Sequence, residues 1–139
     1  MNISFSERVV VVAGGTGGLG KAVSLAFLEE DAKVIVTYRK EEAFRALKDA
    51  AGPKASSLEG SQVDVTDEAA VVPFINRILT QFGALDALVN TVGGYVGGVK
   101  LWEMTTKVFD QMLALNLRSG YVLAHAVMPE RQGMVPSLT

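Results

Sequence analysis

The octapeptide AGGTGGLG at residues 13–20 is the segment of this chain whose residue types most clearly suit a ligand. Five of its eight residues are glycine, which tolerates positive φ and lets a ligand approach the backbone closely. A helix that starts here would also present unpaired N–H groups and a partial positive charge. This pattern predicts a binding site for the pyrophosphate of a dinucleotide, and a flexible glycine loop is the alternative. The residues assigned to the site are Gly14, Thr16, Gly18, Leu19 and Gly20.

A second group of residues bears on which dinucleotide would bind. An acidic residue about 20 positions after the glycines would bind the ribose hydroxyls of NAD. Here the sequence reads Tyr38-Arg39-Lys40, with no acid until Glu41. An arginine can pair with a 2′-phosphate through two hydrogen bonds, so Arg39 favours NADP(H) over NAD(H). The alternative is that Arg39 and Lys40 are solvated charges at the start of a helix.

Two later segments carry residues suited to the adenosine end of the same ligand. Asp64 precedes Val65, and its carboxylate could accept a hydrogen bond from an adenine amino group. A turn or helix-capping role is the alternative for Asp64. Asn90 opens the segment NTVG, which ends at Gly93 and could approach the ribose, while Asn90 could brace the sheet. Both segments are therefore assigned to the cofactor site.

The elements around these segments alternate between strands and helices. Buried strands are expected at 8–12 and 33–38, a more polar strand within 57–65 suits a sheet edge, and a fourth strand is expected at 85–90. Helices are expected at 21–30, at 41–51, between a Thr66 cap and Gly83, and at 106–128. Pro73 requires the third helix to start late or to bend. The alternation predicts a doubly wound α/β parallel sheet, which binds ligands beyond the carboxyl ends of its strands.

The totals restrict the remaining functions. With 139 residues, 49% of them hydrophobic and 20% charged, the chain suits one globular domain spanning residues 1–139. A net charge of −2 argues against nucleic acid as a partner. The absence of cysteine and a single histidine, His125, exclude thiolate and His-rich metal sites but leave a carboxylate-only magnesium site open. No signal-like start or apolar run of about 18 residues is present, so we expect a cytoplasmic protein without membrane spans.

Together these motifs resemble the short-chain dehydrogenase/reductase family over residues 7–129. Gly14, Gly18 and Gly20 match its Gly-x-x-x-Gly-x-Gly loop, with Ala13 where the family usually has Thr. Asp64-Val65 matches its Asp-Val pair, and the segment from Asn90 to Gly93 resembles its Asn-Asn-Ala-Gly loop with two substitutions. The resemblance implies hydride transfer between a nicotinamide and a carbonyl or alcohol. It also implies that Asn116 supports a water-linked proton relay.

The resemblance fails at the family's acid/base residues. The family uses a Ser and a Tyr-x-x-x-Lys motif, and these 139 residues contain no such motif. Tyr121 and His125 share one helix face but are better explained by packing, and Ser137 is at best a remnant of the catalytic-serine region. We therefore expect a sheet truncated after about four strands, which is the cofactor-binding half of an oxidoreductase with little or no turnover by itself.

Two other functions, and self-association, also follow as possibilities from the sequence. The chain could be a non-catalytic nucleotide-binding module or partner subunit. A further alternative is a hydrolase-type activity using Ser119, Tyr121 or His125. Because an unpaired strand edge and uncovered helix faces favour association, we expect a homo-oligomer built through the sheet edge and the C-terminal helices.

Overall fold

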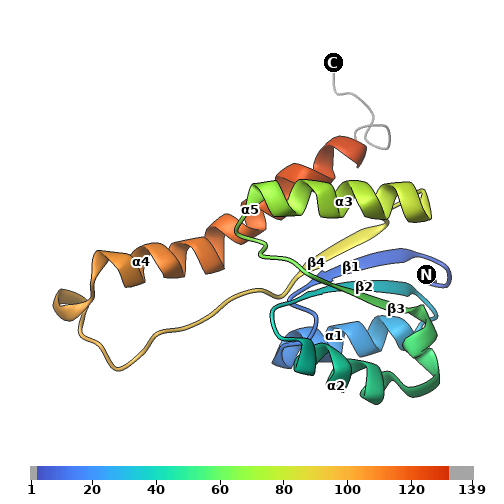
Figure 1. The fold of residues 1–139 in the computed structure, drawn as a ribbon, viewed down its shortest axis with the longest axis horizontal. Coiled ribbons are helices and arrows are strands. Elements are labelled where there is room, and N and C mark those ends of the chain that lie inside the picture. The colour runs from blue at the N-terminus through green and yellow to red at the C-terminus, as the bar shows by residue number, and fades with distance from the viewer. Residues whose placement is uncertain (1–2, 132–139) are drawn as a thin grey trace.

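The computed structural model of the chain describes residues 3–131, in which four parallel strands form one sheet of order β3-β2-β1-β4 (Figure 1). The central strand β1 pairs with β2 on one side and with β4 on the other. The strands are β1 (Val9–Ala13), β2 (Lys33–Tyr38), β3 (Leu58–Gln62) and β4 (Ala87–Asn90). The expected parallel sheet is confirmed, and the polar third strand does lie at an edge.

Helices cover both faces of this sheet, because neighbouring residues of a strand point to opposite sides. Val10 and Val12 of β1 are fully buried in a cluster with residues of α1 and α2, whereas Val9 and Val11 are buried against α3 and α5. The longer helices are α1 (Gly18–Glu29), α2 (Glu41–Ala51), α3 (Glu68–Phe82), α4 (Thr106–Leu113) and α5 (Ser119–Val127). The doubly wound arrangement thus follows from a β-branched run that is apolar on both faces.

Three local expectations need correction. The first helix begins at Gly18 rather than at residue 21, so Gly18 and Gly20 lie in its first turn. Asp67, and not Thr66, caps α3 by accepting a hydrogen bond from the N–H of Ala69 at 3.0 Å. Thr66 instead donates both its N–H and its hydroxyl to the preceding Asp64.

Two helix ends match the sequence, and one proline does not act as expected. α2 ends at Ala51 before Gly52, whose φ is +56°, although a 3-10 helix (Gly52–Ser57) follows at once. α3 ends at Gly83, which is left-handed with φ of 74°. The helix includes Pro73 and still begins at Glu68, so the late start considered for it is wrong. Pro73 is exposed, and water can therefore solvate the carbonyl that its missing N–H leaves free.

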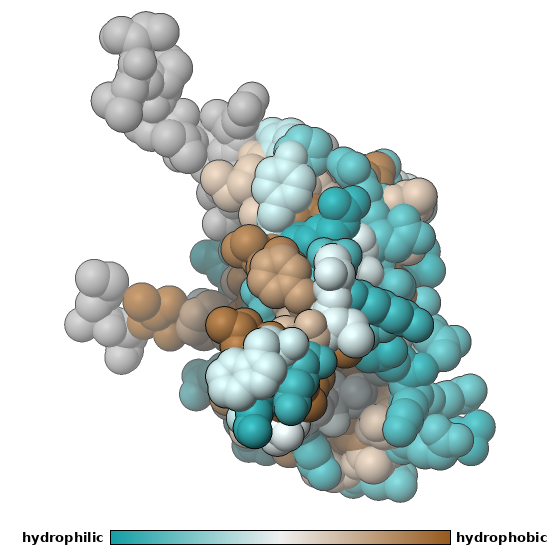
Figure 2. Space-filling model, turned by 90° about the vertical axis from the view of Figure 1, so that its left-hand side faces the viewer, coloured by the Kyte–Doolittle hydropathy of each residue, from teal (hydrophilic) through white to brown (hydrophobic). Residues whose placement is uncertain are grey.

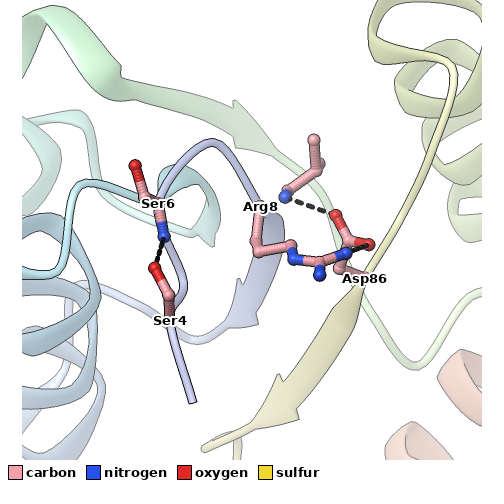
Figure 3. A network of polar contacts seen from close by, with 5 residues as sticks. Ser4, Ser6, Arg8 and Asp86 are labelled. Atoms are coloured by element: carbon pink, nitrogen blue, oxygen red, sulfur yellow. Dashed lines mark hydrogen bonds and ion pairs between the residues drawn. The ribbon is translucent and has the colours of Figure 1, made fainter. Parts of the chain in front are cut away.

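Asp86 joins the amino ends of β1 and β4, at the end of the sheet away from the glycine turn (Figure 3). Its Oδ2 accepts from the N–H of Val9 at 2.8 Å, and its Oδ1 lies 3.4 Å from Nη1 of Arg8. The N–H of Asp86 in turn donates to the carbonyl of Val9 at 2.8 Å. These bonds fix β4 beside β1, which positions the opposite, ligand-facing ends of both strands.

The segment between β4 and α5 leaves the body of the molecule (Figure 1). A loop and a short 3-10 helix (Leu101–Glu103) follow β4 and extend away from the sheet, and α4 returns toward it (Figure 1). A π-helical segment (Ala114–Arg118) joins α4 to α5, so the helix expected over 106–128 is three segments in series. Within residues 3–131, no helix combines the length and the apolar character needed to cross a bilayer. Ser137 lies outside the described residues.

Candidate functional site

The glycine turn begins directly at the carboxyl end of β1. Gly14 has φ of +73°, a conformation that residues with a side chain rarely adopt. Its N–H donates to Oγ1 of Thr37 at 2.9 Å, and its carbonyl accepts from the N–H of Gly17 at 3.1 Å. Thr37 is 2% exposed near the end of β2. A buried hydroxyl therefore holds the turn against the neighbouring strand.

The glycines of the turn serve two distinguishable purposes. A Cβ on Gly20 would lie 1.9 Å from the carbonyl oxygen of Gly14, and one on Gly15 would lie 2.4 Å from Cγ1 of Val36. Those two glycines are required by packing within the protein. A Cβ on Gly18 would meet no atom within 4 Å. Within residues 3–131 no neighbouring atom requires a glycine at position 18, so the space above it is open to a ligand.

The start of α1 is suited to an anion. Its N-cap residue, Gly17, makes no side-chain capping bond, and no acidic side chain occupies the first turn. The N–H groups of this turn are therefore not capped by a side chain, and the helix dipole adds a partial positive charge. Leu19 is 69% exposed beside this opening, and Thr16 is half-buried in the turn. The turn fits the pyrophosphate predicted from the sequence.

The loop after β4 packs against the same turn, but a different residue braces it. The hydroxyl of Thr91 donates to the carbonyl of Ala13 at 2.7 Å and lies 3.1 Å from the carbonyl oxygen of Gly14. The bracing role expected of Asn90 thus belongs to Thr91. Oδ1 of Asn90 instead accepts from the N–H of Val92 at 3.0 Å, which turns the chain toward Gly93.

Asp64 takes the turn role that the sequence left open. Its Oδ1 accepts from the N–H of Thr66 at 2.9 Å and from its hydroxyl at 2.7 Å. These two bonds lower the pKa of the Asp64 carboxyl, and the positive charge of Arg39 lowers it further. Val65 is buried in the core on the α3 side of the sheet, so its side chain is used in packing. A contact between Asp64 and adenine stays a prediction.

Arg39 follows β2 at the same end of the sheet and is exposed. Its carbonyl accepts from Nε2 of Gln62 at 2.8 Å. Within residues 3–131 the guanidinium has no hydrogen-bond or ion-pair partner, so it is available to an anionic ligand. Sequence reasoning missed Gln62 and Thr37. The signal for Thr37 was a hydroxyl near the end of an otherwise apolar strand.

Asn116 lies in the π-helical segment and holds the glycine loop. Its Oδ1 accepts from the N–H of Gly94, and its Nδ2 donates to the carbonyls of Gly94 and Met112, all at 3.0 Å. Both amide hydrogens are thus in use, and a relay through Asn116 would have to use another of its atoms. The relay role implied by the resemblance stays a prediction.

The residues of the hydrolase alternative do not form a nucleophile–base pair. Ser119 is fully buried and donates to the carbonyl of Leu115 at 2.8 Å, not to His125. Nδ1 of His125 lies 3.4 Å from Oε1 of Glu68, and its ring stacks on that of Tyr121 at 5.5 Å. No group of three or more His, Asp or Glu side chains within the described chain could hold a metal ion.

The family model described as "short chain dehydrogenase" matches residues 8–135, nearly the whole chain. The chain belongs to this family. It is 32% identical over 128 residues to mouse L-fucose dehydrogenase, covering 90% of this chain and 44% of that protein. It is 31% identical over 127 residues to an NADP-dependent 3-hydroxy acid dehydrogenase from Salmonella typhi, covering 91% and 49%.

Solved structures of short-chain oxidoreductases share the fold. The structure of ElxO with NADP bound has a TM-score of 0.86 and 32% identity over 92% of this chain and 52% of its own. A metagenomic short-chain oxidoreductase in complex with NADP has a TM-score of 0.87 and 29% identity, covering 95% and 60%. The chain thus spans about half the length of the relatives it matches. The family and these two complexes support a nicotinamide dinucleotide as the ligand of the described site.

Proposed function

We propose that this chain binds NADP(H) across the carboxyl ends of its four strands, as the cofactor-binding part of a short-chain oxidoreductase. The observation that carries the proposal is the open space above Gly18, beside a first turn of α1 that no side chain caps. The family relation supports the same reading. When bound, the nicotinamide would exchange a hydride with a carbonyl or alcohol carbon. Residues 1–139 would form one dinucleotide-binding domain, and the cytoplasmic location stays a prediction.

Different residues of the chain would bind different parts of the ligand. The N–H groups at the start of α1 would bind the pyrophosphate, and Arg39 would pair with the 2′-phosphate. Asp64 and the loop from Asn90 to Gly93 would contact adenine and ribose. Arg39 is the reason to favour NADP(H), since a guanidinium gains a charged partner only from the phosphorylated ribose.

A substitution at Gly18 tests the site without disturbing the fold. Gly18→Asp places a carboxylate in the open space, where it would repel a pyrophosphate. We expect NADPH binding, followed by fluorescence titration, to weaken at least about 30-fold, since repulsion and lost contacts exceed about 2 kcal/mol. The matched control is Thr80→Asp, which adds the same charge near the C-terminal end of α3, away from the glycine turn. Unchanged binding by Gly18→Asp, or no NADPH binding by the native chain, would overturn the proposal.

Binding without turnover is the second candidate for this chain by itself. It is favoured by the absence of a Tyr-x-x-x-Lys motif from the 139 residues. Proton transfer from a positioned group contributes about 10²–10⁴-fold to rate in such enzymes. NADPH oxidation measured with a panel of aldehydes and ketones separates the candidates. Carbonyl-dependent oxidation would show a complete oxidoreductase, whereas tight binding without oxidation would support a nucleotide-binding module.

We further propose that the chain associates with itself through its C-terminal helices. Phe109, Leu113, Leu117 and Tyr121 repeat every four residues along these helices and are each 44–68% exposed. Figure 2 views the molecule from the side on which α4 projects and shows apolar side chains, in brown, gathered among polar ones. Burying such a row would remove apolar surface from water. Sedimentation velocity at micromolar concentration tests this, and a clean monomer would contradict it.

The polar residues beside this row suit a two-fold arrangement. Asp110 and Arg118 line a shallow hollow together with Leu113 and Leu117. Asp110 and Arg118 lie eight residues apart and carry opposite charges. Antiparallel packing of two copies would therefore bring Asp110 of each copy toward Arg118 of the other. A closed two-fold contact of this kind is self-complementary. Within the described residues the outer edge of β4 pairs with no other strand, and it would contribute to the same assembly.

A further inference from the structure

The turn between β2 and α2 is fixed at three points around Arg39. The ring of Tyr38 stacks on that of Phe44 with centroids 4.9 Å apart and planes within 3°. The carbonyl of Lys40 accepts from the N–H of Ala43 at 3.1 Å, which starts α2. Between these two anchors, only the side chain of Gln62 holds the carbonyl of Arg39 within the described chain. The backbone of Arg39 therefore depends on a residue from another strand.

Gln62 is placed for this contact by the register of the sheet. It is the last residue of β3 and pairs with Tyr38, the last residue of β2. The strand ladder ends with this pair, so the next carbonyl along β2, that of Arg39, has no strand partner. The Gln62 amide, 2.8 Å away, supplies the missing donor. In effect, its side chain extends the ladder by one hydrogen bond into the turn.

The neighbouring acids are already engaged by other groups. Oε1 of Glu41, in the first turn of α2, lies 3.3 Å from Nη2 of Arg45. Asp64 accepts two hydrogen bonds from Thr66. The Arg39 guanidinium is thus within electrostatic reach of Asp64 but is bonded to neither acid. A doubly charged phosphate would be its strongest available partner.

We propose that Gln62 is a positioning residue that determines cofactor specificity by holding Arg39 ready for a 2′-phosphate. The inference rests on the proposed binding of NADP(H) and names a residue beyond it. A turn that is already fixed loses less conformational freedom when the cofactor binds. The hydrogen bond from Gln62 therefore strengthens the binding of a 2′-phosphate by Arg39. NAD(H) carries no such phosphate. Loss of the Gln62 bond should therefore weaken NADP(H) binding selectively.

The test compares Gln62→Met with a matched control, Gln81→Met in α3, whose amide also contacts β3. Methionine has nearly the same length but cannot donate to the Arg39 carbonyl. Gln81→Met removes a side-chain amide that donates to Oε1 of Glu59 at 3.1 Å. Glu59, like Gln62, belongs to β3. Binding of NADP⁺ and NAD⁺ to the 139-residue chain is measured by calorimetry. We expect Gln62→Met to weaken binding of NADP⁺ about three- to ten-fold, because the turn would then lose more freedom on binding, and to leave NAD⁺ binding unchanged. Gln81→Met should change neither.

A double-mutant cycle identifies the route by which Gln62 acts. In an Arg39→Ala background, Gln62→Met should have no further effect on NADP⁺ binding. Equal weakening of NADP⁺ and NAD⁺, or an undiminished effect without Arg39, would show a general structural role and overturn the inference. If the native chain prefers NADP⁺ and Gln62→Met keeps the ratio, only the role of Gln62 fails. If the native chain shows no preference for NADP⁺, the proposed cofactor choice fails as well.

Discussion

Replacing Thr37 with valine should weaken both the fold and the nucleotide site, because this one hydroxyl connects them. Valine has nearly the same shape but cannot accept the hydrogen bond from the N–H of Gly14, which is 2.9 Å long. Leaving a buried donor without a partner costs about 1–3 kcal/mol. Gly14 is half-buried, so part of that loss is recovered by water. We expect the free energy of unfolding to fall by about 1–2 kcal/mol.

For a chain of 139 residues, this change corresponds to a Tm lower by roughly 3–10 °C, measured by circular dichroism. Binding of NADP⁺ should weaken about three- to ten-fold, since the glycine turn loses its anchor to β2. The control is Thr37→Ser, which keeps the hydroxyl and loses one buried methyl group. It should lower stability by about 1 kcal/mol and leave binding unchanged. Native binding by Thr37→Val, or equal binding losses in both variants, would refute this role of the hydroxyl.

Three further predictions follow from the same structure. Gly18→Ala should keep or slightly raise the Tm, because the added Cβ enters open space. Gly20→Ala should lower the free energy of unfolding by more than about 2 kcal/mol, because its Cβ would overlap the carbonyl oxygen of Gly14. Equal melting temperatures of the two variants would contradict this prediction. The lowered pKa of Asp64 means that its bonds to Thr66 stabilise the fold above the ordinary carboxyl pKa of about 3.9 and lose effect as the pH falls below it. Asp64→Ala should therefore be less stable than the native chain at pH 7 in urea unfolding, with the difference shrinking toward pH 2, and a constant difference would count against it. Leu117→Glu should shift the sedimentation coefficient to that of a monomer with little change in Tm, because the side chain is 68% exposed in a single chain; an unchanged assembly would exclude this helix face.

Much of the fold was predictable because its signals are local. A run of valines before a glycine-rich segment is apolar on both faces, so it could only be a central strand with helices on either side. Gly83 marks a helix end because glycine, which has no Cβ, adopts the left-handed conformation without steric strain. The glycine turn was likewise predictable as a strand–turn–helix junction that places N–H groups at one point, and its binding of a phosphate stays a prediction.

Expectations that depended on competing hydrogen bonds were less successful. Thr66 looked like a helix cap, but its hydroxyl and N–H both donate to Asp64, and Asp67 caps α3 instead. Asn90 looked like the brace of the sheet, yet Thr91 reaches the carbonyls of β1 and the glycine turn. In each case neighbouring polar residues could make the same bond, and only the path of the backbone chooses between them.

By itself, the sequence determined the alternation of strands and helices, the position of the glycine turn and the charge at Arg39, because each depends on residue type and spacing along the chain. The tertiary structure decided that Gly15 and Gly20 are required by packing, whereas Gly18 leaves room for a ligand. It also brought Thr37 and Gln62, from two other points in the chain, against the carboxyl ends of β1 and β2. Those contacts join residues 23 positions apart. They arise only when parallel strands align in register, which no local pattern specifies.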